Sequence, residues 1–462
     1  MTQDDTISAI ATAVGEGGIG IIRLSGENSL TIASQIFEPK NGSNVIDIPS
    51  HRVTYGQIVD HEKDCVIDEG LLLTMHGPHS YTREDVVEFH CHGGAMAMQN
   101  VLALTLKCGA RLAEPGEFTK RAFLNGRLDL SQAQAVIDII RSKTDASLRM
   151  AVGHLSGEFS DKVRGFRHDI LQMIAHLEAA IDFPEDDIDE VATDSAREQV
   201  VHIKEEIEAL LSTAKTGKVL RDGLETAIIG KPNVGKSSLL NAMLRETRAI
   251  VTDIPGTTRD IIEEFANIGG VPLKIIDTAG IRATDDTVEK IGVEKARSYV
   301  DRADLILALF DGSSNLDHED EEILSLIKGR KALIVINKSD LNAGSTVKES
   351  INKELPNHEI IHLSTVNGAG MDALEEYIVD LVYSGTVEQK EGVFVNSVRQ
   401  AELLRKACTH LDEVLNTIDQ EMSPDFIVID LRSAWEKLGE ITGDTVGEDI
   451  IDQIFSQFCI GK

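Results

Sequence analysis

A glycine-rich segment in the middle of the chain combines residue types that bind phosphate. The sequence GKPNVGKSS contains the pattern G-x-x-x-x-G-K-S, formed by Gly230, Gly235, Lys236 and Ser237. In such a loop, glycines turn backbone N–H groups toward the phosphates, the lysine bridges phosphate oxygens, and the serine supplies an oxygen to Mg²⁺. An apolar run precedes the segment and a helix-like run follows it, so a helix N-terminus would add positive potential. This pattern predicts a nucleotide site with bound Mg²⁺.

Motifs for the γ-phosphate and the base follow along the chain, each where an apolar run ends. IIDTAG places Asp277 near the Mg²⁺ shell and the Gly280 N–H near the γ-phosphate. INKSD ends at Asp340, whose carboxylate can accept from both N1–H and N2–H₂ of guanine, a donor pair that adenine lacks. LSTVNG, with Ser364, fits a loop behind the base, and GTTRD places Thr258 on Mg²⁺ in a switch segment. The ordered set predicts GTP as the nucleotide.

The GTP-binding prediction covers the phosphate loop, the switch segments and the base-binding strand end. The residues are Asn233, Val234, Gly235, Lys236, Ser237, Ser238, Thr252, Asp253, Ile254, Pro255, Gly256, Thr257, Thr258, Asp277, Thr278, Ala279, Gly280, Asn337, Lys338 and Asp340. Mg²⁺ is expected at Ser237 and Thr258. This part of the chain resembles the translation-factor branch of the small GTPases, which implies a Ras-like P-loop domain.

The residue after the D-x-x-G motif is Ile281, where Ras-like enzymes carry a glutamine that orients the attacking water. An isoleucine side chain cannot hold water, so the catalytic group has to come from elsewhere in the switch segments. The candidates are Arg259, Arg282, Asp285, Asp286 and Glu289. For each of them, solvated loop charge is the alternative interpretation.

The chain divides into four segments that would position these motifs. Residues 1–120 alternate short apolar runs with glycine-rich turns, which indicates strands with a helix or two between them. Residues 121–222 and 384–462 have apolar residues at helical spacing, which indicates long amphipathic helices. In residues 223–383, continuous apolar runs alternate with helices, which indicates a parallel sheet flanked by helices. We expect an α/β and all-α multidomain fold, with an α+β N-terminal domain and a GTPase domain inserted into a discontinuous helical domain.

The composition excludes several classes of protein. The 462 residues are 42% hydrophobic, and no apolar run reaches the roughly 18–20 residues that span a bilayer. The N-terminus MTQDDTISAI lacks a signal-peptide pattern, and five scattered cysteines without a CxxC pair indicate a reducing compartment. The net charge of −32, from 45 basic and 77 acidic residues, argues against broad nucleic-acid binding through phosphate contacts. We therefore expect a cytoplasmic protein that does not bind membranes.

Several further segments carry a resemblance that spans the whole chain. They are GGIGIIRLSG, SYTREDVVEFHCHGG, PGEFTKRAFLNGRLDL, DIPGTTRD, DTAGIR and the terminal FCIGK. Together with the P-loop that contains Asn233, and with helical halves around the GTPase domain, they resemble the MnmE (TrmE) family. The resemblance implies a K⁺-activated GTP hydrolase whose G domains dimerise, and whose hydrolysis is coupled to modification of C5 of the tRNA wobble uridine.

The same resemblance implies the cofactors and partners. The N-terminal domain would bind folate and mediate dimerisation, with 5,10-methylene-tetrahydrofolate as the one-carbon donor and 5-formyl-tetrahydrofolate as its analogue. The homodimer would act on tRNA together with an FAD-dependent partner of the GidA (MnmG) type, in a heterotetramer. The product would be an aminomethyl or carboxymethylaminomethyl group on the uridine.

Catalytic residues are carried over from the family position by position. K⁺ is expected to bind the Asn233 side chain and the backbone carbonyls of Thr252, Ile254 and Thr257. A monovalent cation there can neutralise the charge that other GTPases neutralise with an arginine finger. The water-orienting glutamate falls on Glu289, which would supply what Ile281 cannot, while Lys236 holds the phosphates. Arg259 and Arg282 are expected to steady the switches.

Four charged residues are expected to form a folate site. A folate has paired donors on its pterin and carboxylates on its glutamate tail, so its receptor needs a carboxylate and cations. By resemblance, the folate-binding residues are Arg23, Glu84, Arg127 and Lys462. Arg127 stands where a lysine is common in the family, and it keeps the charge with a different geometry. For Arg23 and Glu84, an ordinary surface pair is the alternative interpretation.

The terminal FCIGK also contains Cys459, which has three interpretations. It fits a catalytic nucleophile toward uridine C6, with Lys462 as its activator, or a spacer beside Lys462, or a small buried packing residue, which is the more common role of a free cysteine. If the two helical segments pack together, the tail can reach the N-terminal domain. Lys462 would then join Arg23 and Glu84.

The segment HCHGG raises a metal interpretation, because His90 and His92 alternate onto one face of a strand. No Cys/His spacing of zinc type completes the set, so we favour a polar strand end that faces a cavity. Cys91 is then expected on the opposite, buried face.

Two functions of other classes compete with tRNA modification. A regulatory G protein of the ribosome-assembly type would share the P-loop and switch motifs, but it would carry a basic RNA-binding domain, and this chain is acidic. An ATP-using or purely structural helical protein is opposed by the guanine motif NKSD.

Overall fold

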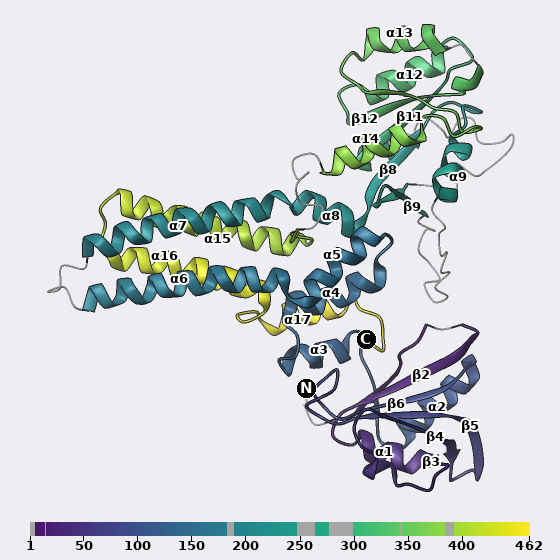
Figure 1. Cartoon of the computed structure of the whole chain (residues 1–462), viewed down its shortest axis with the longest axis vertical. Helices are drawn as coiled ribbons and strands as arrows, with labels where there is room; N and C mark the ends of the chain where they lie inside the picture. The colour runs from purple at the N-terminus through teal and green to yellow at the C-terminus, as the bar shows by residue number, and fades with distance from the viewer. Residues whose placement is uncertain are drawn as a thin grey trace.

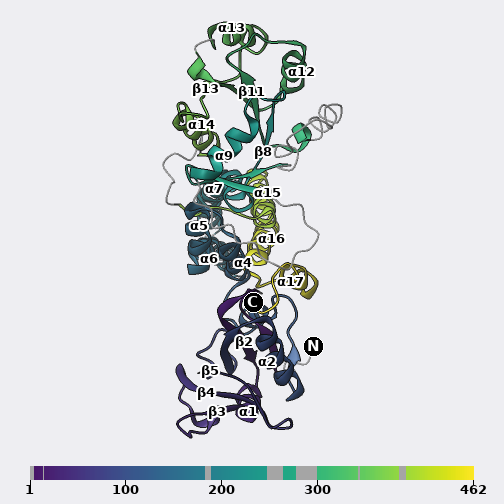
Figure 2. The same cartoon turned by 90° about the vertical axis from the view of Figure 1, so that its right-hand side faces the viewer.

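The computed structural model describes residues 5–13, 15–182, 189–246, 264–276, 299–341, 344–383 and 392–462. The molecule is elongated, with a sheet near each end and a layer of long helices between them (Figure 1). A view turned by 90° shows these parts stacked along the longest axis (Figure 2). The C-terminal end lies where the helical layer meets the N-terminal sheet.

The N-terminal sheet has seven strands in the order β3-β4-β5-β6-β2-β1-β7. Neighbouring strands are antiparallel, except that β1 and β7 are parallel. The elements are β1 (Ile7–Ile10), β2 (Gly17–Ser25), α1 (Ser29–Ile36), β3 (Phe37–Pro39), η1 (Val45–Asp47), β4 (Arg52–Asp60), β5 (Cys65–Met75), β6 (Val86–Gly93), α2 (Ala95–Lys107) and β7 (Arg111–Leu112). Ile22 of β2, Leu72 of β5 and Phe89 of β6 lie in one apolar core together with residues of α1 and α2. Cys91 lies in the same core, as predicted.

The helices of the middle layer come from two segments that are far apart in the sequence. The first contributes α3 (Glu117–Leu124), α4 (Leu130–Arg141), α5 (Asp145–Ser156), α6 (Glu158–Asp182), α7 (Asp189–Ser212) and α8 (Ala214–Asp222). The second contributes α15 (Val398–Asp419), α16 (Pro424–Thr442) and α17 (Glu448–Phe455). One apolar core joins them, with Phe159 and Leu177 of α6, Leu404 of α15 and Leu431 of α16. The two segments thus bury each other's apolar stripes, as the helical spacing predicted.

The second sheet has six strands in the order β13-β12-β11-β8-β10-β9. Its elements are β8 (Leu224–Ile229), α9 (Lys236–Glu246), β9 (Glu264–Ile268), β10 (Val271–Ile275), β11 (Leu305–Asp311), α12 (His318–Ile327), β12 (Ala332–Asn337), η3 (Ser339–Leu341), α13 (Gly344–Glu354), β13 (Ile360–His362) and α14 (Met371–Tyr383). Apolar cores lie on both of its faces, which explains the continuous apolar runs in the sequence.

One strand corrects the prediction of a parallel sheet. Strand β9 pairs antiparallel with β10, whereas β8, β10, β11, β12 and β13 are parallel to their neighbours in that part of the sheet. The physical reason is the link between β9 and β10, which consists only of Gly269 and Gly270, at φ 57° and 88°. A two-residue turn with positive φ closes an antiparallel hairpin and is too short for a parallel crossover.

The helical layer and the six-stranded sheet are joined where the chain crosses between them twice. The Val395 N–H donates to the Thr213 hydroxyl at 3.0 Å, and the Thr216 hydroxyl donates to the Val382 carbonyl at 2.8 Å. The chain therefore enters and leaves the sheet side by side, as an insertion requires. The predicted division at residue 120 falls inside α3, while α8 ends at Asp222 and α14 at Tyr383.

Within the described ranges, no helix combines the length and the apolar character needed to cross a membrane.

Candidate functional site

The phosphate-binding pattern lies between the end of β8 and the start of α9, as the sequence predicted. Asn233 and Gly235 have φ values of 64° and 102°, so the loop turns through left-handed conformations. A Cβ on Gly235 would collide with Nδ2 of Asn337, which makes glycine necessary at this position. The backbone thus forms a close, curved loop at a helix N-terminus, which suits a phosphate group.

Lys236 is the first residue of α9, and its ammonium group folds back over the loop. Nζ donates to the carbonyl of Gly230 at 2.7 Å and to the carbonyl of Lys231 at 2.8 Å. Burial lowers the pKa of Lys236 below its usual value. Both of these carbonyl acceptors are neutral, so phosphate oxygens would be stronger partners for this ammonium group.

Asn337 connects the phosphate loop to the loops at the base-binding end of the sheet. Its side chain is 1% exposed, donates from Nδ2 to the Val234 carbonyl at 2.8 Å, and accepts at Oδ1 from the Thr365 N–H at 3.2 Å. Beyond it, the Ser364 hydroxyl donates to Asp340 Oδ1 at 2.7 Å. The expected guanine carboxylate is therefore oriented by the loop that the sequence placed behind the base.

Lys338 is held beside this carboxylate loop. It has a φ of 61°, and its Nζ lies 2.6 Å from Oδ2 of Asp311, the last residue of β11. The pKa of Asp311 is lowered, because the hydrogen bonds from Lys338 and Ser313 outweigh its burial. The ion pair connects the carboxyl ends of β11 and β12, where the motifs were expected to meet.

Several predicted residues lie outside the described ranges. They are Thr252, Asp253, Ile254, Pro255, Gly256, Thr257, Thr258, Arg259, Asp277, Thr278, Ala279, Gly280, Ile281, Arg282, Asp285, Asp286 and Glu289. Of the expected metal ligands, Ser237 and Asn233 are described, both as exposed residues of the phosphate loop. The oxygen of Ser237 at the start of α9 suits Mg²⁺, and the exposed amide oxygen of Asn233 suits a hard monovalent cation.

The charged residues of the expected folate site lie on and beside the N-terminal sheet, but Arg23 and Glu84 are not paired. Arg23 Nε instead donates to Oε1 of Glu88, its cross-strand neighbour, at 2.7 Å. The Arg23 guanidinium also lies 5.7 Å from the Phe118 ring centroid and 6.0 Å from that of Tyr81. The surface-pair interpretation is therefore wrong, and Arg23 lies in a partly enclosed aromatic setting.

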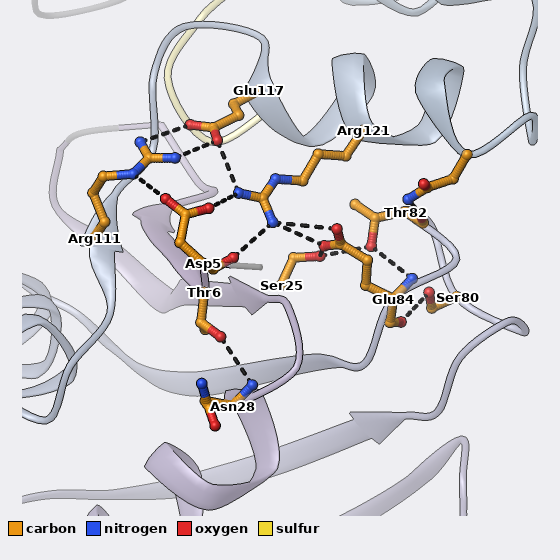
Figure 3. Close-up of polar contacts among 11 residues, drawn as sticks. Asp5, Thr6, Ser25, Asn28, Ser80, Thr82, Glu84, Arg111, Glu117 and Arg121 are labelled. Carbon is orange, nitrogen blue, oxygen red and sulfur yellow. Dashed lines mark hydrogen bonds and ion pairs between the residues drawn. The ribbon is translucent and has the colours of Figure 1, made fainter. Parts of the chain in front are cut away.

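Glu84 is bound by a different set of groups. Both of its carboxylate oxygens lie 3.2 Å from Nη1 of Arg121, and Oε2 also accepts from the Ser25 hydroxyl at 2.6 Å (Figure 3). Ser25 and Arg23 are two residues apart on β2, so they point to the same face of the sheet. Glu84 and Arg23 thus lie near one face without touching.

Arg127 and Lys462 complete the group. Arg127 Nη1 donates to the Tyr81 carbonyl at 3.0 Å, and its guanidinium lies 4.7 Å from the Tyr81 ring centroid. Lys462 is partly buried, and its pKa is lowered by this burial and by the positive charge of Arg23. The charge of Glu88 acts in the opposite direction. The charges of Arg23 and Glu88 therefore both act on the C-terminal lysine.

The C-terminal tail is seated on the N-terminal part of the chain. The Gly116 N–H donates to the Cys459 carbonyl at 3.3 Å, and Phe458 packs on Phe455 with ring centroids 5.3 Å apart. Gly461 has a φ of 90°, and a Cβ there would overlap the backbone of Ile10. The expectation that the tail reaches the N-terminal domain is confirmed. The Cys459 side chain is exposed, which does not support the packing interpretation.

The histidines of HCHGG each contact a carboxylate. His90 Nε2 lies 3.2 Å from Oε2 of Glu88, and His92 Nδ1 lies 2.7 Å from Oδ1 of Asp68. In the described part of the chain, the side chains spaced to hold a metal ion lie elsewhere, on α15 and α16. They are His410, Glu413 and Asp430.

Sequence reasoning missed Glu88, Arg121 and Tyr81. Glu88 lies four residues after Glu84 in SYTREDVVEF, so strand alternation could have placed it beside Arg23. Arg121 occurs in a helix-like segment, where an arginine normally indicates a solvated face. Glu117, four residues earlier on the same helix, is a local i,i+4 partner that the sequence does signal. Asp5 and Glu84 come from remote parts of the chain, and the sequence contains no local signal for them.

Comparisons with known proteins cover the whole chain. The model of the MnmE helical domain matches residues 130–459, and the model of the GTP-binding protein TrmE N-terminus matches residues 6–127. The tRNA modification GTPase MnmE of Alkaliphilus metalliredigens (strain QYMF) is 50% identical over 462 residues, which is 100% of both chains. The protein of the same name from Clostridioides difficile (strain 630) is also 50% identical, with the same coverage.

A solved G domain of FeoB from Methanococcus jannaschii is 26% identical and covers 34% of this chain and 97% of its own, with a TM-score of 0.25. Such a low TM-score carries no argument about function. The full-length relatives and the two family models do carry one, and they agree with the P-loop and guanine-motif geometry. The chain belongs to the MnmE family of tRNA modification GTPases, and it is a GTP hydrolase that acts in tRNA modification.

Proposed function

We propose that this protein is a K⁺-activated GTPase that modifies C5 of the tRNA wobble uridine, with 5,10-methylene-tetrahydrofolate as the one-carbon donor. The observation that supports this most is the seating of the C-terminal tail. It brings Lys462 to Arg23 and Glu88 on the N-terminal sheet, about 440 residues away in sequence from Arg23. A cationic, partly enclosed site of this kind suits a ligand with carboxylates.

The residues of the N-terminal site match the two ends of a folate. Arg23, Lys462 and Arg127 supply positive charge for the glutamate tail, and Arg127 stacks on Tyr81. The carboxylate of Glu84 can accept from the paired donors of a pterin. Bound tetrahydrofolate would supply the one-carbon unit, while the protein residues bind and orient it. Cys459, exposed beside this site, remains a candidate nucleophile toward the uridine.

The nucleotide site supports the hydrolase part of the proposal. Lys236 would exchange its carbonyl partners for phosphate oxygens, and Ser237 would contribute to Mg²⁺ binding. Asp340 and Asn337 would hold guanine and its surrounding loops. Asn233, with Thr252, Ile254 and Thr257, would bind K⁺.

The proposed assembly is a homodimer that works with an FAD-dependent partner of the GidA (MnmG) type. The net charge of −32 makes broad tRNA contact by this chain unfavourable. Most of the positive surface for tRNA would then come from the partner. The division of labour explains how an acidic chain acts on a nucleic acid.

Nucleoside analysis of tRNA tests the proposed reaction. In cells that lack this protein, we expect the wobble uridine to lose its C5 aminomethyl-type group, and in cells that regain the gene we expect the group to return. Mass spectrometry of digested tRNA measures both. An unchanged pattern of wobble nucleosides in the deletion strain would contradict the tRNA assignment.

Replacing Glu289 with alanine is expected to abolish GTP turnover while leaving GTP affinity close to normal, because a water-orienting carboxylate acts mainly in the transition state. Single-turnover hydrolysis and equilibrium nucleotide binding separate these effects. Near-normal turnover of the variant would show that another group orients the water.

The GTP hydrolysis rate of the wild-type protein is expected to be higher in K⁺ than in Na⁺ at equal ionic strength. Equal rates in the two salts would refute K⁺ activation.

A further inference from the structure

Glu84 belongs to a connected network of two guanidinium groups and three carboxylates (Figure 3). Arg111 binds Asp5 and Glu117, with Nε 2.6 Å from Asp5 Oδ2 and Nη2 2.6 Å from Glu117 Oε1. Arg121 binds the same two carboxylates, with Nη2 2.6 Å from Asp5 Oδ1 and 3.0 Å from Glu117 Oε1. Arg121 alone of the two arginines also reaches Glu84.

The charges of these five residues do not cancel. Three carboxylates against two guanidinium groups leave one negative charge when all are ionised. Asp5 and Glu117 are each shared by both arginines, and their pKa values are lowered. Of the two arginines, Glu84 contacts Arg121 alone, and it does so at 3.2 Å, which is longer than the other contacts of this arginine. Glu84 is thus the least compensated carboxylate of the network.

Glu84 is also the carboxylate that can still bind a ligand. Its side chain is 20% exposed, whereas the Glu117 side chain is 8% exposed. One Arg121 nitrogen lies equally far from both Glu84 oxygens, so it approaches the carboxylate from one side and between them. A carboxylate has about four acceptor positions, and the contacts with Arg121 and Ser25 occupy three of them. The remaining capacity suits N–H donors that arrive from the exposed side.

The main chain around Glu84 is fixed independently of Arg121. The Ser80 hydroxyl donates to the Glu84 carbonyl at 2.5 Å, and the Glu84 N–H donates to the Thr82 hydroxyl at 3.3 Å. The direction of the Glu84 side chain is therefore set mainly by Arg121 and by Ser25. Arg121 itself is 9% exposed and is locked by Asp5 and Glu117, so it has little freedom to follow a displaced carboxylate.

We propose that Arg121 is a positioning residue that holds the Glu84 carboxylate in the orientation that accepts the paired N–H donors of a pterin ring. This inference rests on the proposed folate function and assigns a part of the site that does not touch the ligand. Asp5 and Glu117 hold the Arg121 guanidinium directly. Through Glu84, the network would bind the pterin ring of the ligand, while Arg23 and Lys462 would bind the carboxylates of its glutamate tail.

Isothermal titration of the full chain with 5-formyl-tetrahydrofolate tests the proposal through two double-mutant cycles. The first combines Arg121→Gln with Glu84→Gln, and the second combines Arg111→Gln with Glu84→Gln. Arg111 is the matched control, because it belongs to the same network and has no contact with Glu84. A role confined to stability would lower the thermal midpoint of both arginine variants and would leave the two cycles alike.

We expect Arg121→Gln to weaken binding by about tenfold or more when Glu84 is present, and by less than about threefold in the Glu84→Gln background. Arg111→Gln should weaken binding by less than about threefold in either background. Binding of p-aminobenzoyl-glutamate, which has the tail carboxylates and no pterin, should be the same for wild type and Arg121→Gln. If Arg121→Gln does not fold, Arg121→Lys takes its place in the cycle, since it keeps the charge and loses the fork geometry.

Three results would overturn the proposal, and they can be told apart from failure of the folate function. The first is an Arg121→Gln variant that binds 5-formyl-tetrahydrofolate with unchanged affinity. The second is a loss of affinity from Arg121→Gln that is equally large with and without Glu84. The third is a loss of affinity from Arg111→Gln as large as that from Arg121→Gln. A wild-type protein that does not bind 5-formyl-tetrahydrofolate would instead reject the folate function, and the positioning role with it.

Discussion

Lys236→Ala is expected to lower the GTP hydrolysis rate by at least about a hundredfold, because it removes the cation that would stabilise charge on the transferred phosphate. The ammonium group lies over the phosphate loop, on the carbonyls of Gly230 and Lys231, and its partial burial strengthens its interaction with a charged ligand. GTP affinity should also fall. Single-turnover hydrolysis at saturating GTP measures the rate, and binding of a fluorescent guanine nucleotide measures the affinity.

Lys231→Ala is the matched control for this prediction. Lys231 lies in the same loop, but its Nζ binds Asp317 and Asp320, each at 2.7 Å. This variant should hydrolyse GTP within about threefold of wild type, because the Lys231 ammonium group is engaged by these two carboxylates. Loss of the ion pair with the buried Asp320 is expected to lower stability instead. A Lys236→Ala variant that hydrolyses GTP as fast as Lys231→Ala would show that the P-loop lysine does not act on the phosphates.

Gly461→Val is expected to abolish tRNA modification, with a loss of at least about a hundredfold if the tail must be seated for the reaction. Gly461 has a φ of 90°, which is costly for a β-branched residue. A side chain there would also overlap the Ile10 carbonyl and lie 3.1 Å from the Ala11 Cα. The tail would have to leave this position and carry Lys462 away from Arg23. The measurement is the fraction of modified wobble uridine in cells that produce only the variant.

Ile460→Ala provides the control, because Ile460 is 53% exposed and its truncation does not change the close approach of Gly461 to the Ile10 backbone. We expect this variant to retain modification close to the wild-type level. GTP binding should be the same for both variants, since α9, which follows the P-loop, lies on the opposite side of the helical layer from the C-terminus (Figure 1). If Gly461→Val supports normal modification, the close seating of the tail is not needed for the reaction.

The described parts of the expected nucleotide site could be located from the sequence because they are short and local. A P-loop needs glycine at Gly235, a lysine and a serine in consecutive positions, and the order of strands then brings the carboxyl ends of β8 and β12 together. Asp340 and Ser364 were assigned to the base from their strand ends, and they are 2.7 Å apart through their side-chain oxygens. Such motifs can be recognised in a sequence because each consists of a few consecutive residues that act together.

The direction of β9 was missed although its signal was present. The pair Gly269 and Gly270 between two apolar runs is a hairpin signal, and continuous apolar runs in the surrounding sequence favoured a parallel sheet instead. A turn of two residues allows only an antiparallel neighbour. The Gly269–Gly270 turn therefore determines the direction of β9, although the apolar runs of the surrounding segment indicate parallel strands.

The residue types that bind phosphate, guanine and carboxylates were determined by the sequence, as were the helical and strand periodicities. Which partner each charge takes was decided only by the folded chain. Arg23 pairs with Glu88 across two strands, and Arg121 binds Asp5 and Glu84 from two remote segments in addition to Glu117 of its own helix. Charged side chains are long and exchange partners at little cost in an unfolded chain, so their pairing is set by burial and by the position of the backbone. The tail is the clearest example, because Lys462 acquires its neighbours only when α17 has packed against α3.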